Sequence, residues 1–287
     1  MAEAPMHETP DYDLLKTPDE MQVPDGPASP RLWIAAAFFA AALAAAVTVY
    51  FLYVRRPAPA APAAAKAVEA PRAIQPLGGE PEAIAVPPLD ESDAVVRTLV
   101  RTITSHPAAL KWLGTSGLIR TFTVVVENLV DGSTPARHLA VLRPASAFRV
   151  VERDRQLFID PRSYERYDGL ADAAASIDPA GAARVYATLK PRIQEAYGQL
   201  GLPPDSFDRA LERAIVLLLQ TPVVDGPIRV APKGGIGYQY SDPNLEALTA
   251  AQKHLLRTGP RNVRTVQSAL RRLALALGVP PERLPHT

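Results

Sequence analysis

The chain contains no cysteine in its 287 residues. That absence excludes disulfide frameworks, thiol nucleophiles and zinc sites built from cysteine. Aromatic residues are also few, at 6% of the chain, and acidic and basic residues nearly balance, so that the formal net charge is +1. The balance conceals an asymmetry, because residues 1–30 hold seven acids and one lysine, whereas residues from 250 onward hold seven bases and one acid. Each end is therefore a candidate for binding a separate partner.

One long hydrophobic run, from Leu32 to Val54, contains no charged side chain. As a helix it would be about 34 Å long, enough to cross a hydrocarbon core of roughly 30 Å. Arginines stand on both sides of the run, at Arg31 and Arg55. The segment before it is about thirty residues long and acidic, unlike the short basic leader of a cleaved signal peptide. The run therefore predicts a single membrane anchor with the lipid bilayer as its partner.

Two features of the sequence favour opposite orientations of this predicted anchor in the membrane. Two basic residues precede the span and four follow it within the counted range, which favours a cytoplasmic C-terminus. However, a long spacer before a domain is common in proteins that reach outward from the bacterial inner membrane, and long domains cross largely regardless of charge. We expect a single-pass protein of the bacterial inner membrane with its C-terminal domain in the periplasm.

The composition divides the chain into four parts. We predict a disordered acidic tail over residues 1–31, the transmembrane helix over 32–54, a Pro/Ala-rich linker over 55–88 and a domain over 89–284. The linker has repeated proline and no sustained apolar period, so it buries too little surface to offset the entropy of ordering. The domain part is long enough for one substantial core.

The domain is predicted to be mainly α-helical, with one or two small β-hairpins. Asp90 to Asp93 form a helix start, and the helix they begin ends before Pro107. Apolar residues recur three and four positions apart in further stretches, which predict helices over about 107–113, 118–129, 162–176, 180–200, 206–220, 244–256 and 260–277. Pro191 is expected to kink or end its helix.

Three segments of the domain carry signals for strands. The β-branched residues 121–126 make a strand the alternative to a helix at that point. Residues 148–152 and 156–159 flank a short polar turn, which predicts a hairpin. A second hairpin is indicated by 228–231 and 236–240 around the turn Lys233-Gly234-Gly235.

Several segments of the chain resemble a bacterial family described as domain of unknown function 3014. They are Pro87 to Asp93, Leu118 to Phe122, Glu127-Asn128, Tyr164 to Tyr167, Asp242 to Glu246 and, most specifically, Ala251 to Pro260. The resemblance extends from about Pro87 to Leu277. It implies a bacterial protein with one membrane span and one domain, and it assigns no activity and no catalytic residue.

The motifs of well-known catalytic and metal sites do not occur in the chain. Its five histidines never form HxH, HxxxH or HExxH, and no GxSxG, SxxK or GxxxxGK[ST] motif is present. The glycines around Lys233 are more typical of a hairpin turn than of a phosphate cradle, since no helix is expected to follow them. We therefore predict no catalytic residue, no metal ligand and no cofactor.

Tyr164, Tyr167 and Asp168 form an aromatic and charged cluster in one predicted helix. Their spacing of three and four places them on one helical face. Such groups could line a pocket for a sugar or a peptide. The alternative is that both tyrosines pack their rings internally and bond their hydroxyls to arginine or aspartate.

Other candidate ligand-binding residues are Arg120, Arg137, His138 and Arg143. Arg120 lies on the polar face of a predicted helix, and the other three follow in an irregular segment. Arginine suits carboxylate and phosphate ligands, so the four residues could form an anion site. Arginine is equally suited to structural pairing, and loops with solvated arginine are ordinary.

The last predicted helix has a cationic face that includes Arg261 and Arg264. Arg271 and Arg272 lie on the same side, opposite an apolar stripe. This helix could dock an envelope protein or an anionic surface. The alternative is a core-packing helix with a solvated face. We expect no nucleic acid as a partner, because no aromatic platform accompanies these arginines.

These observations favour a membrane-anchored, non-enzymatic binding or scaffolding module of the bacterial cell envelope. The alternative hypothesis is an uncharacterised envelope enzyme with a site near Tyr164–Asp168.

Overall fold

The computed structural model describes residues 76–234 and 237–286. The predicted acidic tail, the predicted transmembrane helix over 32–54 and the predicted linker as far as residue 75 lie outside the described residues. Within the part that the structure describes, no helix is both long and apolar enough to cross a membrane.

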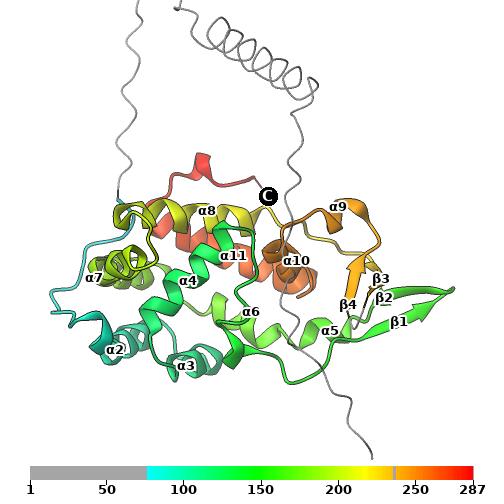
Figure 1. Cartoon of the computed structure of the whole chain (residues 1–287), viewed down its shortest axis with the longest axis horizontal. Helices are drawn as coiled ribbons and strands as arrows, with labels where there is room; N and C mark the ends of the chain where they lie inside the picture. The colour runs from blue at the N-terminus through cyan, green and yellow to red at the C-terminus, as the bar shows by residue number, and fades with distance from the viewer. Residues whose placement is uncertain (1–75, 235–236, 287) are drawn as a thin grey trace, which may run out of the picture. The chain divides into compact units, whose positions relative to one another are not determined.

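Residues 76–88, the strap, lie against the helices that follow and are drawn in cyan in Figure 1. Leu77 is only 5% exposed. The amide of Gly78 donates to the carbonyl of Leu277 over 3.0 Å, and that of Gly79 donates to Ala183 over 3.1 Å. The described part of the predicted linker is therefore held by apolar burial and backbone hydrogen bonds, and the packed chain begins before the expected boundary at residue 89.

The domain is mainly helical, as the sequence predicts. Its α-helices are α2 (Asp93–Ile103), α3 (Pro107–Leu113), α4 (Leu118–Val130), α5 (Arg162–Glu165), α6 (Asp168–Ala175), α7 (Pro179–Gly198), α8 (Phe207–Leu219), α9 (Pro243–Glu246), α10 (Ala250–Leu256) and α11 (Pro260–Ala276). Single 3₁₀ turns lie at Leu89–Glu91, Ala140–Leu142, Pro204–Ser206 and Pro281–Arg283.

The main core lies among α2, α4, α7, α8 and α11, and Figure 1 shows α8 and α11 running beside each other. Phe207 at the start of α8 is fully buried. Its ring centroid lies 5.6 Å from that of Phe122, 5.0 Å from Tyr197 and 6.4 Å from Tyr186, so α4 and α7 converge on one aromatic residue of α8. Phe122 belongs to α4, where burial of one apolar face overrides the β-branched content and excludes the strand alternative.

The two predicted hairpins are present and join into one four-stranded antiparallel sheet. The strands are β1 (Val150–Arg153), β2 (Gln156–Ile159), β3 (Arg229–Lys233) and β4 (Gly237–Tyr240), in that spatial order. Leu157 of β2 faces Val230 of β3, which links segments about seventy residues apart. Ile159, Val230 and Tyr240 form a second, smaller core with Leu256 of α10.

Two predicted helices are each divided in the structure. The stretch 162–176 forms α5 and α6, because the chain turns at Arg166 and Tyr167. The stretch 244–256 forms α9 and α10, because Thr249 caps α10 through a reciprocal capping box with Gln252. Conversely, α7 continues through Pro191 without a boundary.

Candidate functional site

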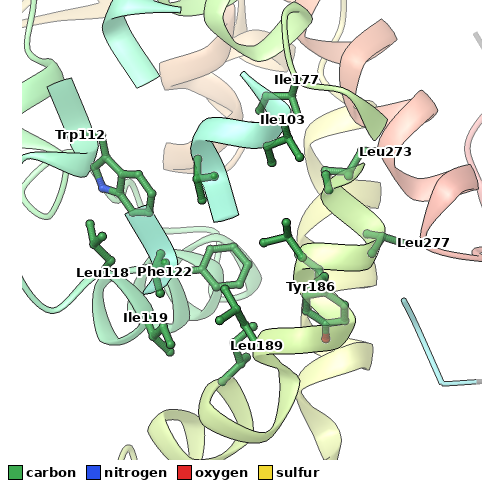
Figure 2. Close-up of a pocket in the computed structure, with 16 residues that line it drawn as sticks. Ile103, Trp112, Leu118, Ile119, Phe122, Ile177, Tyr186, Leu189, Leu273 and Leu277 are labelled. Atoms are coloured by element: carbon green, nitrogen blue, oxygen red, sulfur yellow. The ribbon is translucent and has the colours of Figure 1, made fainter. Parts of the chain in front are cut away.

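An apolar cavity of about 250 Å³ lies between α2, α4 and α7, with further walls from α3, α8 and α11. Figure 2 shows Trp112 and Phe122 on one side of it and Tyr186 and Leu273 on the other. Hydrocarbon side chains provide nearly all of its surface, since the described lining residues are alanine, valine, leucine, isoleucine and three aromatic residues.

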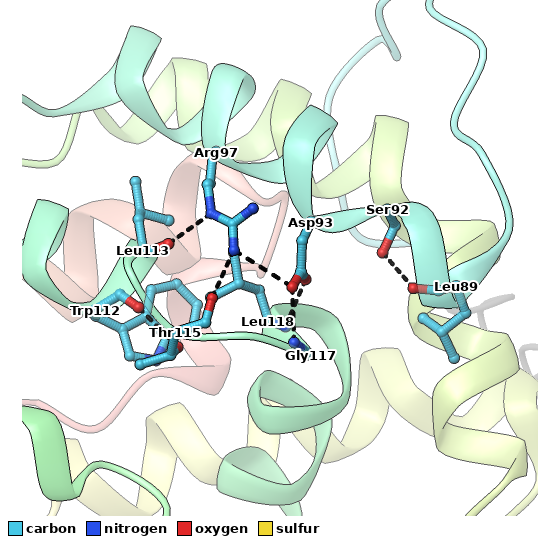
Figure 3. Close-up of polar contacts among 9 residues, drawn as sticks. All are labelled: Leu89, Ser92, Asp93, Arg97, Trp112, Leu113, Thr115, Gly117 and Leu118. Atoms are coloured by element: carbon cyan, nitrogen blue, oxygen red, sulfur yellow. Dashed lines mark hydrogen bonds and ion pairs between the residues drawn. The ribbon is translucent and has the colours of Figure 1, made fainter.

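A group of fixed polar contacts holds α2, α3 and α4 around one side of this cavity (Figure 3). The carboxylate of Asp93 accepts hydrogen bonds from the amides of Gly117 and Leu118 over 2.8 and 2.9 Å, which caps α4. Arg97, one turn later, donates to the carbonyls of Leu113 and Thr115, each over 2.7 Å. Because helix ends leave unpaired amides and carbonyls, these contacts fix the ends of α3 and α4 to α2.

Tyr186 carries the one hydroxyl among the described lining residues. It donates to Asp208 over 2.5 Å, and Lys190 donates to the other oxygen of the same carboxylate over 2.6 Å. The amide of Leu77 in the strap also donates to Asp208, over 2.9 Å. Burial, followed by the hydrogen bond to Asp208, raises the pKa of Tyr186 well above its usual range. This hydroxyl therefore stays neutral, while its ring faces the cavity.

The chemistry that such a lining permits is binding of an apolar molecule. A cavity without polar partners does not hold ordered water, whereas apolar molecules enter comparable cavities readily. The lining supplies no nucleophile, acid or base within the described residues. The cavity is therefore suited to recognition by shape and hydrophobicity.

The predicted cluster at Tyr164, Tyr167 and Asp168 is brought together around Asn262 of α11. The Asn262 amide donates to the Tyr164 carbonyl over 3.1 Å and to the Asp168 carboxylate over 2.8 Å, and Asn262 is only 1% exposed. Arg261 forms an ion pair with Asp168 at 3.2 Å. Because α5 ends before Tyr167, the three residues do not share one helical face as the sequence predicts, and α11 joins them instead.

Tyr167 and His254 line a second cavity, of about 270 Å³, whose other walls are largely apolar. Their rings meet edge to face with centroids 6.1 Å apart, and the Tyr167 hydroxyl accepts a hydrogen bond from Arg166. Burial, with added repulsion from Arg257 and Arg166, lowers the pKa of His254. This geometry favours the packing interpretation of the tyrosine cluster.

Among Arg120, Arg137, His138 and Arg143, the predicted anion-site residues, the first three each have a polar partner within the domain. Arg120 pairs with Asp90 at 2.7 Å, and the side chain of Asp90 is 83% exposed. Arg137 donates to the ring of His138 over 2.9 Å. Arg143 is exposed after the 3₁₀ turn Ala140–Leu142.

The arginines of α11 engage separate partners within the domain. Arg261 pairs with Asp168 and Asp172, and Arg264 pairs with Asp225. The two later arginines of the helix, at 271 and 272, donate to backbone carbonyls. The cationic face predicted from the sequence is therefore divided among several local contacts.

Sequence patterns did not identify the cavity, because a side chain that lines a cavity has the same helical spacing as one that fills the core. Asn262 and Gln267 carry a weak signal, since both are polar residues buried on a helix with an apolar stripe. Among the residues that the structure describes, no three histidine, aspartate or glutamate side chains are grouped as a metal ion requires.

Comparison with known proteins identifies a family. No curated protein and no solved structure matches the chain. The model of a family described as "Protein of unknown function (DUF3014)" matches residues 118–274. The match begins with α4 and ends two residues before the end of α11. That match spans more than half of the 287 residues and confirms the resemblance seen in the sequence. The chain therefore belongs to the DUF3014 family.

Proposed function

We propose that this chain is a membrane-anchored, non-enzymatic binding module of the bacterial cell envelope, and that its cavity between α2, α4 and α7 binds an apolar ligand. The membrane anchor in this proposal is the run Leu32–Val54, and the domain lies on the periplasmic side. Residues 55–75 connect the two parts. As an extended chain of about 3.1 Å per residue, this connection would reach about 65 Å, so the domain would stay near the bilayer surface.

The observation that carries the proposal is the apolar lining of a cavity of about 250 Å³. Where side chains around such a space lack contacts, the folded state loses stability, by about 24 cal/mol for each Å³ of closed cavity. Domains are commonly stable by only about 5–15 kcal/mol in total. A hydrocarbon occupant would recover much of that loss, because it restores the missing contacts. Lipid acyl chains are the apolar molecules nearest to a tethered domain.

The geometry favours binding over the enzyme alternative. That alternative places its site at Tyr164–Asp168, where the Asp168 carboxylate is held by Asn262 and Arg261. The hydroxyl of Tyr167 accepts a hydrogen bond from Arg166. These contacts engage the Tyr167 hydroxyl and the Asp168 carboxylate as internal supports of α6 and α11.

Fluorescence of Trp112 tests the proposed ligand site directly. The chain has two tryptophans, Trp33 and Trp112, so Trp33→Phe leaves only the cavity residue. The full chain would be placed in phosphatidylcholine nanodiscs and titrated with a brominated fatty acid, which quenches tryptophan on contact. We expect saturable quenching, which Ala182→Leu abolishes because Ala182 lines the cavity.

The matched control is Ala180→Leu, an exposed position on the same helix. It should leave the quenching unchanged. Equal quenching in both leucine variants would mean that the fatty acid meets Trp112 outside the cavity, and it would overturn the proposal. A separate test of location is a topology reporter fused after Thr287, and reporter activity confined to the cytoplasm would refute the periplasmic placement.

A further inference from the structure

A third pocket, of about 750 Å³, lies between the end of α8, one face of α11 and the C-terminal residues. Gln267 of α11 donates to the carbonyls of Leu219 and Thr221 over 3.1 and 2.8 Å, which fixes α11 against the end of α8. Arg264 stands three residues before Gln267 and Arg271 four residues after it. Both arginines therefore lie on the same helical face and line the pocket together with Thr221.

Thr221 is the unusual residue of this pocket. It is 3% exposed, and its hydroxyl has no hydrogen-bond partner within the described part of the chain. A buried hydroxyl without a partner costs about 1–3 kcal/mol, so such groups normally meet a protein atom, a water or a ligand. The hydroxyl oxygen itself has almost no exposed surface. Since Thr221 lines the pocket, rotation of its side chain about χ1 would turn the hydroxyl toward a molecule held there and give it the missing partner.

The charges of the pocket favour an anion. Arg271 donates to the neutral carbonyl of Pro285, and that contact leaves its positive charge in place. Arg264 pairs with Asp225, but the two side chains are 54% and 68% exposed. An exposed ion pair contributes little in water, so the Arg264 guanidinium can exchange Asp225 for another anion. Ser268 lies between the two arginines on the same face and adds a hydroxyl.

We propose that this pocket binds a phosphate group, with Arg264 and Arg271 pairing its oxygens and the Thr221 hydroxyl donating to it. Arginine matches phosphate through parallel N–H donors, and hydrogen bonds to a charged acceptor are about twice as strong as neutral ones. The volume of about 750 Å³ leaves room for an organic body that carries the phosphate. The site is separate from the apolar cavity and does not depend on its function.

A phosphate ester could come from two sources, a dissolved metabolite or a phospholipid headgroup. Glycerol 3-phosphate represents the chemistry that they share. In the first arm, the full chain in phosphatidylcholine nanodiscs is titrated with glycerol 3-phosphate, and chloride is adjusted to keep the ionic strength constant. The rise in the unfolding midpoint gives the dissociation constant, because a ligand of the folded state alone stabilises it. In the second arm, phosphatidic acid replaces part of the nanodisc lipid.

The variants separate a built site from general attraction of anions. We expect Arg271→Gln to weaken binding about tenfold or more, and the near-isosteric Thr221→Val to weaken it about threefold, since each removes one contact to a charged acceptor. Arg209→Gln is the matched control, because Arg209 is an exposed arginine of α8 that lines a different pocket. It should bind like the unmodified chain.

Each result decides the proposal. Stabilisation in the first arm that Arg271→Gln and Thr221→Val reduce supports a soluble phosphate ester, and the same pattern in the second arm alone supports a lipid headgroup. If all three variants were stabilised equally, the effect would be a general attraction of anions to the protein. That result would overturn the proposed site. No stabilisation in either arm would also overturn it. Thr221→Val preserves the size of the side chain, so we expect it to fold. It therefore keeps the proposal testable even if Arg271→Gln misfolds.

Discussion

Asp93 connects two helices at the scale of a single side chain. It is the first residue of α2, yet its carboxylate accepts from the amides at the start of α4. The sequence predicts the acids of residues 90–93 as caps of the helix that they begin. Spacing along the chain identifies a capping residue only for its own helix, and the partner twenty-four positions later depends on the tertiary fold.

Replacing this carboxylate should destabilise the domain. We expect Asp93→Ala to lower the free energy of unfolding by about 1–2 kcal/mol, because two amides of α4 lose their acceptor. Asp90→Ala is the control, since Asp90 forms only an exposed pair with Arg120 and should change stability by less than about 0.5 kcal/mol. Urea denaturation of the full chain measures both, and equal losses would contradict the capping role.

His254 gives the domain a pH dependence of defined sign. Burial lowers its pKa in the folded chain, so the unfolded chain binds the proton more tightly. Its contribution to stability is therefore complete above the usual histidine pKa of about 6.5 and is lost as the pH falls below that value. We expect the urea concentration at the midpoint of unfolding to decrease as the pH is lowered from about 6.5 to about 5.

His254→Gln should flatten this dependence, because glutamine does not titrate. The exposed terminal histidine provides the control, and His286→Gln should keep the slope of the unmodified chain. A slope that persists in His254→Gln would assign the effect to other groups.

The hairpin of β1 and β2 illustrates how an element can keep a strained residue. Its two-residue turn, Asp154-Arg155, has positive φ at both positions, 51° and 59°. Those values are typical of the turn that best matches the twist of a β-hairpin, where glycine is preferred at the second position. Arginine tolerates this conformation at a cost of about 1–2 kcal/mol.

We expect Arg155→Gly to raise the free energy of unfolding by about 0.5–1 kcal/mol, after allowance for the entropy that glycine loses on folding. Arg153→Gly should have the opposite effect, since Arg153 lies within β1 and pairs with Gln156. Chemical denaturation of the two variants decides the matter. A loss of stability in Arg155→Gly would show that the arginine side chain compensates for its backbone.

Elements were predictable from the sequence where periodicity and local caps decide them. The stripe of α11 and both hairpins follow from spacing and turn residues. The division of α9 from α10 was also readable, because Thr249 and Gln252 form a capping-box pattern. The break at Tyr167 was not readable, since it accompanies packing of Tyr164 against Gly259 and of Tyr167 against His254, about ninety residues away.

At the scale of the whole molecule, the strap sets where the folded unit begins. The described residues, from 76 onward, belong to one compact unit. The sequence places the boundary at residue 89, because residues 76–88 have the composition of a linker. Burial of Leu77 and its contact with Asp208 depend on α7 and α8, so composition alone does not reveal them.

Two fragments test this boundary. We expect a fragment of residues 71–287 to unfold at the same urea concentration as the domain in the full chain. A fragment of residues 89–287 should be less stable by about 2 kcal/mol, since it loses the burial of one leucine and several hydrogen bonds, offset by the entropy of releasing the strap. Equal stability of the two fragments would mean that the strap contributes nothing.

Neither the apolar cavity between α2, α4 and α7 nor the pocket at Thr221 could be located from the sequence. Val96, Phe122 and Leu189 have the pattern of core residues, and only the distance between helices turns them into cavity walls. Arg264 was identified as a candidate from its cationic helix face, but Thr221 has no local signal, because an unpartnered hydroxyl is a property of the packed structure.

The hydrogen bond between Gly78 and Leu277 joins the beginning of the described fold to the end of α11. The chain then continues to Leu284, whose side chain is buried, so the last residues also belong to the packed domain. A circular permutant that joins residue 286 to residue 76 through a glycine segment long enough to span them, and opens at the turn Asp154-Arg155, would therefore keep every buried contact described above.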